Sequence, residues 1–267
     1  MVCGCEEDSW DNEGCCNCQE KYNYYTGSSA GLSTFEDELS PGVSLFLTRL
    51  LTFVSFAFLL QGILILVVGD TDKKWDASLS VSGRTTTPVR PVVFSGCIMI
   101  IAGVVHIIVS MFLHSQFNSD TENGRHNILW ITESILKSPF FFAAGFMFGI
   151  RDIWLLLTFS ILLGMASIFK LFAEYAENAL VAIAGFVFNL YVFGITFSFR
   201  GEYGPEGIAL EVIVPALFIL EYAIFFFPVC RDDTGPPRLV VIIFSILVNL
   251  VSFSLIAWLF MACGKNK

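Results

Sequence analysis

The sequence places a carboxylate and an ammonium group four residues apart inside an otherwise apolar stretch. The stretch is "ILWITESILKSPFFFAAGFMFG" (128–149), and the two charged residues are Glu133 and Lys137. Four residues make about one helical turn, so the two side chains share a helix face in the favoured order, with the glutamate first. Pro139 cannot donate a backbone hydrogen bond and predicts a kink beside Lys137. These residues indicate either a packed, mutually neutralised pair or a buried polar site.

Four further polar residues fall at similar depths in other apolar stretches. His106, Asn189, Glu221 and Asn249 each lie about ten residues or more from the start of such a stretch. His106 fits a hydrogen-bonded core histidine, and the two asparagines fit hydrogen bonds between helices. Glu221 has no cation in its own stretch, so it needs Lys137 from across the bundle or a neutral carboxyl group. Together the polar residues predict a shared interior, which is a pocket, a proton path or a hydrogen-bond network.

The elements that position these residues are membrane-spanning helices. Of the residues 55% are hydrophobic and only 15% are charged, against about 25% charged in soluble domains. A spanning helix needs about 20 apolar residues, and continuous rather than alternating runs exclude barrel strands. The sequence therefore predicts an all-α bundle of seven transmembrane helices, an integral multi-pass protein in a lipid bilayer. The expected helices are 43–68, 92–114, 127–150, 153–173, 179–199, 208–228 and 238–262.

Two regions outside these helices have their own character. Residues 1–42 hold nine acidic residues, one base and five of the eight cysteines, and we predict a disordered acidic tail before a single transmembrane domain at 43–267. Its cysteines fit reduced thiols, lipidation or metal binding. In the first loop, "SLSVSGRTTTPV" (78–89) alternates around a glycine and predicts a short β-hairpin.

Other chemistry has no support in the residues. No phosphate-binding loop, paired-histidine metal site or Ser/His/Asp arrangement is present, so we expect neither an enzyme nor a metal site. The net charge of −9 lies largely in the tail and gives no reason to expect nucleic-acid binding. Lys170 counts among the lysines and arginines that flank the helices, which leaves Lys137 as the only lysine expected near the middle of a span.

Several stretches, taken in order, resemble the heliorhodopsins, which are seven-helix retinal proteins. They are "LLQGILILVV" (59–68), "AGVVHIIVS" (102–110), "FGIRD" (148–152), "FKLFAEYAEN" (169–178) and "SLIAWLF" (254–260). The resemblance implies a rhodopsin-like bundle, a cytoplasmic N-terminus, β structure in an outside first loop, and homodimers. The lysine and arginine count, by contrast, does not decide the topology.

The sequence departs from this family where the family holds its chromophore. Heliorhodopsins carry retinal on a lysine of helix seven, and the match places that lysine at Phe253. No lysine occurs from 238 to 261, and a phenyl ring cannot form an imine. The family's counterion motif aligns with Thr132-Glu133-Ser134, which puts the acid one residue late, and one residue turns a helix by about 100°.

Three functions follow from these residues. The first is a retinal-free, heliorhodopsin-like membrane protein of sensory or regulatory type that binds a small ligand or an unidentified protein partner, with no cofactor. In the second, retinal binds non-covalently or through Lys137, because a buried lysine can lose its proton and act as a nucleophile. The third is a proton or ion path. The candidate interior pocket consists of His106, Glu133, Lys137, Asn189, Glu221, Asn249 and Phe253.

Overall fold

The structure is a computed structural model that describes residues 41–72, 74–78, 86–122, 125–176, 178–196, 205–230 and 238–263. The predicted tail at 1–42 lies almost wholly outside the described residues. Within them the elements are α3 Pro41–Val68, β1 Trp75–Ser78, β2 Thr86–Val89, α4 Pro91–Ile107, the π-helical turn Ile108–Phe112, α5 His114–Glu122, α6 Asn127–Met147, α7 Ile153–Ala176, α8 Ala179–Thr196, α9 Pro205–Cys230 and α10 Arg238–Cys263.

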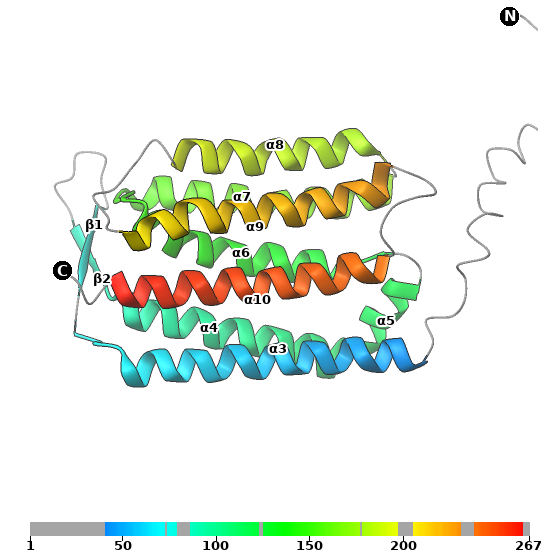
Figure 1. Cartoon of the computed structure of the whole chain (residues 1–267), viewed down its shortest axis with the longest axis horizontal. Coiled ribbons are helices and arrows are strands. Elements are labelled where there is room, and N and C mark those ends of the chain that lie inside the picture. Colours follow the sequence, from blue (N-terminus) through cyan, green and yellow to red (C-terminus); the bar gives the residue numbers. More distant parts are fainter. Residues whose placement is uncertain are drawn as a thin grey trace, which may run out of the picture. The chain divides into compact units, whose positions relative to one another are not determined.

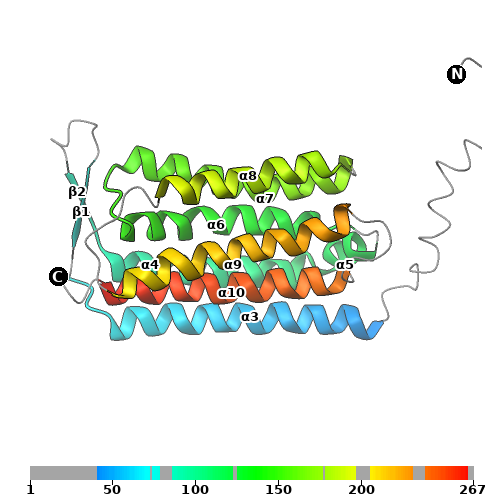
Figure 2. The same ribbon diagram turned by 45° about the horizontal axis from the view of Figure 1, so that its top comes forward.

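The long helices lie side by side along a common direction (Figure 1), and a second view shows the same arrangement (Figure 2). Four of the described helices contain segments long and apolar enough to cross a membrane, namely Gly42–Val68, Pro91–Phe112, Ile153–Ala176 and Leu239–Ala262. Shorter apolar helical segments occupy Leu180–Thr196 and Val212–Ala223. The prediction of an all-α membrane protein is confirmed at this level.

The first loop contains the predicted β-hairpin. Strands β1 and β2 pair antiparallel, with Trp75 opposite Val89 and Ser78 opposite Thr86. The hairpin lies between the end of α3 and the start of α4, at one end of the helices (Figure 1). Pro91 occupies the first turn of α4, where its missing N–H costs no hydrogen bond.

The second predicted helix, 92–114, corresponds to the candidate span Pro91–Phe112, although the last turn of this span is not regular α-helix. Regular α-helix stops at Ile107 and continues as a π-helical turn to Phe112, and a separate helix, α5, starts at His114. The nine residues of α5 are mostly polar ("HSQFNSDTE"). They lack the apolar run on which the prediction of spanning helices rested, so this element was missed.

Helices α6 and α7 form the most extensive helix pair in the described structure. They join through a short turn at Gly149, whose φ of 93° favours glycine. Gly164 permits their close approach, because a Cβ there would lie 2.6 Å from Ser138 Oγ and 2.9 Å from the Ser134 carbonyl oxygen. Ser138 Oγ also donates a hydrogen bond to the Ser160 carbonyl, at 2.9 Å. This pair of helices positions the polar residues described next.

Candidate functional site

Helix α6 presents Glu133 and Lys137 on the same face, one turn apart. The Lys137 ammonium donates a hydrogen bond to Glu133 Oε1, so the pair predicted from the spacing forms in the structure. The helix continues through Pro139 to Met147. Both side chains are buried, at no more than 2% exposure, although charged groups in protein interiors are rare unless they are paired.

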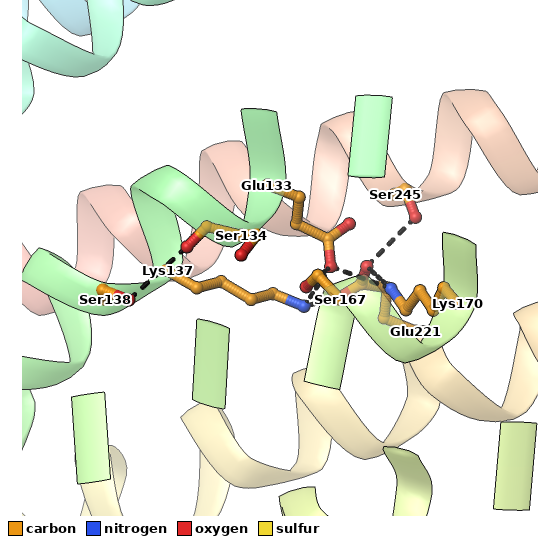
Figure 3. A network of polar contacts seen from close by, with 8 residues as sticks. All are labelled: Glu133, Ser134, Lys137, Ser138, Ser167, Lys170, Glu221 and Ser245. Atoms are coloured by element: carbon orange, nitrogen blue, oxygen red, sulfur yellow. Dashed lines mark hydrogen bonds and ion pairs between the residues drawn. The ribbon is translucent and has the colours of Figure 1, made fainter. Parts of the chain in front are cut away.

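Two more charged residues complete the cluster from neighbouring helices. Lys170 on α7 lies with its Nζ 2.9 Å from Glu133 Oε1 and 2.5 Å from Glu221 Oε1 on α9. Lys137 Nζ lies 3.0 Å from Glu221 Oε2. Each lysine therefore contacts both glutamates, and each glutamate contacts both lysines (Figure 3). We call Glu133, Lys137, Lys170 and Glu221 the ion quartet.

Two serine hydroxyl groups extend the ion quartet. Ser167 Oγ on α7 donates to Glu133 Oε1 at 2.5 Å, and Ser245 Oγ on α10 donates to Glu221 Oε1 at 3.1 Å (Figure 3). The network thus links α6, α7, α9 and α10. Two carboxylates and two ammonium groups sum to zero charge, which removes the need for an external counterion in an interior that disfavours net charge.

Aromatic rings surround the two ammonium groups. Lys170 Nζ lies 4.6 Å from the ring centre of Trp130, 5.3 Å from that of Tyr222 and 5.9 Å from that of Phe225. Lys137 Nζ lies 4.9 Å from the ring centre of Phe218. Ring faces attract cations within about 6 Å, so each ammonium group has favourable aromatic contacts in addition to its carboxylates.

A layer of phenyl rings adjoins the ion quartet. Phe253 on α10 stacks face to face on Phe140 of α6, with 4.1 Å between ring centres and 3° between planes. The ring centres of Phe58 and Phe218 lie 6.2 and 6.5 Å from that of Phe253. We call these four residues the aromatic layer. Phe218 is the member of the aromatic layer that contacts the ion quartet, because its ring face also lies against Lys137 Nζ.

The structure brings together some of the predicted pocket residues and separates others. Glu133, Lys137 and Glu221 meet in the ion quartet, and the expected link from Glu221 to Lys137 across the bundle is present. His106 is buried, but its Nδ1 bonds the carbonyl oxygen of Ala102, 2.8 Å away on its own helix. Its ring lies against Phe58, at 5.3 Å between centres.

The two predicted asparagines form no described hydrogen bond with the ion quartet. Asn189 on α8 is buried, and both polar atoms of its side chain lack a partner among the described residues. Asn249 on α10 is buried with its Oδ1 likewise unpartnered. The predicted single polar layer therefore resolves into a charged cluster and separate polar groups.

Lys170 lies in the interior, contrary to the expectation from the sequence. It was counted with the charges that flank the helices, yet its side chain has no measurable exposure. The signal was available, because Lys170 falls inside the apolar stretch 153–173 and is preceded and followed by Phe169 and Leu171. Lys137 is consequently not the only lysine buried in the interior.

The site also has limits in what it can hold. Among the described residues, no group of three or more histidine, cysteine, aspartate or glutamate side chains could hold a metal ion. The ion quartet presents paired charges rather than a free nucleophile, since each ammonium group donates to two carboxylates. Its described contacts are therefore those of a charge-balanced cluster.

Comparison with known proteins adds no relative. No protein-family model matches the chain, and no curated protein matches it. The similarity to heliorhodopsins therefore rests on the sequence stretches alone.

Proposed function

We propose that this protein is a heliorhodopsin-like, seven-helix integral membrane protein that carries no covalently bound retinal. It acts as a sensory or regulatory membrane protein that binds a small apolar ligand or a protein partner. The observation that carries this proposal is the position of Phe253. Where the family holds its retinal lysine, this chain has a buried phenyl ring stacked flat on Phe140.

The count and order of the helices support the rhodopsin-like part of the proposal. Seven of the described helices have 17 residues or more, and the short helix α5 and the hairpin lie in the connections between them. The hairpin occupies the first connection, where the resemblance expects β structure. The same resemblance extends the proposal to a homodimer with a cytoplasmic N-terminus.

The contacts of Lys137 count against the alternative in which it carries retinal. An amine must lose its proton to attack an aldehyde, whereas Lys137 Nζ lies among two carboxylates and the face of an aromatic ring. All three neighbours favour the protonated amine. Lys170 Nζ likewise lies in contact with both carboxylates and the face of Trp130, so it is no free amine either.

Reconstitution with retinal tests the proposal directly. The full chain is expressed in membranes supplied with all-trans retinal, beside a known heliorhodopsin as the assay control, and visible spectra are recorded before and after acid denaturation. We expect a pigment in the control and no protein-bound band in this chain. A band that survives acid denaturation as a protonated imine, and is lost in Lys137→Ala or Lys170→Ala, would contradict the proposal.

Topology and assembly have separate tests. A cysteine introduced at the exposed Lys74, in the first loop, should react with a membrane-impermeant maleimide from outside the cell. Reaction from the cytoplasmic side only would reverse the proposed orientation. The mass of the purified protein in nanodiscs, measured by light scattering, should correspond to two copies, and a mass of one copy would reject the homodimer.

A further inference from the structure

The polar contacts between α6 and α7 continue from the ion quartet to one end of the helices. On the α6 side His126, Trp130 and Glu133 follow one another at intervals of about one turn, and on the α7 side Glu174, Lys170 and Ser167 do the same. We call these six residues the α6–α7 seam. Three sets of contacts join its two sides: His126 with Glu174, Trp130 with Lys170, and Glu133 with Ser167 and Lys170.

The outer end of the seam is a histidine held by a carboxylate. Glu174 Oε1 lies 2.6 Å from His126 Nδ1, and Glu174 Oε2 accepts the backbone N–H of His126 at 3.0 Å. An ionised carboxylate only accepts hydrogen bonds, so in the neutral form of the ring the proton is on Nδ1. The other nitrogen, Nε2, is then a base that can take up a proton, and it is buried without a partner among the described residues.

Three polar atoms along the α6 side of the seam are buried without a hydrogen-bond partner among the described residues. They are His126 Nε2, Trp130 Nε1 and Glu133 Oε2. Buried polar groups are nearly always hydrogen-bonded, and internal water commonly fills that role. The helical rise separates these residues by about 6 Å and about 4.5 Å, and a water bridging two polar groups spans about 5.5 Å. Along the helix axis the seam therefore spans a length that a short chain of hydrogen-bonded waters can cover.

The position of the seam along α7 places its outer end at a membrane face. Trp154 and Tyr175 are exposed near the two ends of α7, where aromatic side chains mark membrane–water interfaces. They are separated by about 31 Å along the helix, close to the hydrocarbon thickness of about 30 Å. Glu174 is next to Tyr175, so the pair of His126 and Glu174 lies at the level of one interface.

On the opposite side of the ion quartet lies the aromatic layer. One turn beyond Lys137 on α6, Phe140 stacks on Phe253. Phe218 closes the gap between this stack and the charges, because its ring contacts both Lys137 and Phe253. The polar seam therefore leads from the ion quartet to the membrane face at which α6 begins, and the aromatic layer blocks the other direction.

We propose that the α6–α7 seam is a water-linked proton path that connects the ion quartet to the membrane face at which α6 begins, and to that face alone. A proton from hydronium in the bulk water binds His126 Nε2. His126 Nε2 then releases it to the first water of a hydrogen-bonded chain along the seam, each water passes a proton to the next, and the last water gives up a proton to Glu133 Oε2, where an O–H bond forms. The indole N–H of Trp130 donates to a water of this chain and keeps its own proton. Lys137 and Lys170 keep their protons, so the ion quartet gains one positive charge.

Several titratable groups face this path. Lys137 on α6 and Lys170 on α7 contact Glu133, and Glu174 on α7 contacts His126. Glu221 on α9 and Ser245 on α10 belong to the same network, Tyr222 on α9 lies against Lys170, and Asp120 on α5 accepts a hydrogen bond from Asn127, next to His126. Among these, Glu133 is the acid whose unpartnered oxygen lies on the seam. It is therefore the group that receives the proton.

Hydrogen exchange tests whether the seam is hydrated. The full chain, with ¹⁵N-labelled tryptophan and in nanodiscs, is moved to D₂O and the loss of each indole N–H is followed by NMR. Trp258 is the matched control, because its indole N–H is partly buried and donates to Gln61 Oε1 at 3.0 Å. We expect Trp130 to exchange faster than Trp258 although it is the more buried residue. Equal or slower exchange at Trp130 overturns the proposal.

Proton delivery is tested by infrared spectroscopy after a pH jump. Acidification should produce a protonated-carboxyl band that shifts in frequency in Glu133→Asp. In His126→Phe its appearance should slow by about 100-fold or more, since a positioned proton-transferring side chain contributes about 10²–10⁴-fold. His114→Phe, at an exposed histidine on α5, should leave the rate unchanged. If His126→Phe does not fold, Glu174→Gln is measured in its place, because Glu174 holds His126 in the same pair. A rate equal to that of the wild type, in whichever of the two variants folds, overturns the proposed path.

Discussion

The ion quartet and the aromatic layer are neighbouring parts of one interior, built from the same helices. Helix α6 contributes Lys137 to the first and Phe140 to the second, and α9 contributes Glu221 and Phe218 in the same way. In the ion quartet each charge is balanced by its neighbours. In the aromatic layer the position that the resemblance assigns to a lysine is a stacked ring, and no charge is left to balance. The difference shows that, between these two described regions, the buried cations lie on α6 and α7 rather than on α10.

Breaking the charge balance should have the largest effect. In Lys170→Met the two glutamates keep one ammonium group between them, and removing one partner of a buried ion pair costs about 3–5 kcal/mol. We expect this loss in the free energy of unfolding, measured by denaturant titration in detergent with intrinsic fluorescence. Lys74→Met, at an exposed lysine in the first loop, should stay within about 0.5 kcal/mol of the wild type.

A double variant separates charge balance from packing. Lys170→Met with Glu221→Gln leaves one carboxylate and one ammonium group, Glu133 and Lys137, which are already paired. It should recover a substantial part of the stability lost in Lys170→Met. A double variant less stable than the single one would show that the individual hydrogen bonds matter more than neutrality.

Opening the aromatic layer should have the next largest effect. Phe253→Ala removes one ring of the stack with Phe140 and leaves a cavity, which costs about 3 kcal/mol for a well-packed phenylalanine. The matched control is Phe53→Ala on α3, whose ring is 64% exposed in the protein alone and should cost far less. Equal losses in the same denaturant titration would mean that the aromatic layer is loosely packed and open to a ligand.

Weakening the outer end of the α6–α7 seam should have a smaller effect. In Glu174→Gln the amide oxygen can still accept one of the two hydrogen bonds from His126, so we expect a loss of about 1 kcal/mol. Asp76→Asn, at an exposed position of the hairpin, should leave the free energy of unfolding unchanged. A loss as large as that of Lys170→Met would make the pair part of the ion quartet's charge balance rather than a separate outer end.

Hydropathy and helical spacing predicted most of the fold. The long apolar stretches located the helices, and the alternation around Gly83 located the hairpin. The spacing of Glu133 and Lys137 predicted their contact because both lie on one helix. The unpaired Glu221 signalled a partner on another helix, which the structure identifies as both Lys137 and Lys170.

The remaining features depend on how the helices are rotated and packed. Lys170 lies near the end of its apolar stretch, where a lysine can extend its side chain to water, and only the rotation of α7 turns it toward Glu133. The stack of Phe140 on Phe253 joins residues more than a hundred positions apart. The order of residues along the chain carries no direct signal for such a contact.

A change in ionic strength should have the smallest effect on the stability difference between wild type and Lys170→Met. The size of this effect reports whether dissolved ions reach the ion quartet. Exposed charge pairs weaken in salt, because the screening length falls from about 30 Å at 0.01 M to about 3 Å at 1 M. Each member of the ion quartet is at most 2% exposed, so the stability difference between wild type and Lys170→Met should be the same at both salt concentrations. A difference that shrinks in 1 M salt would show that ions reach the charges. Constant stability together with fast exchange at Trp130 would mean that the α6–α7 seam admits water and protons but excludes ions.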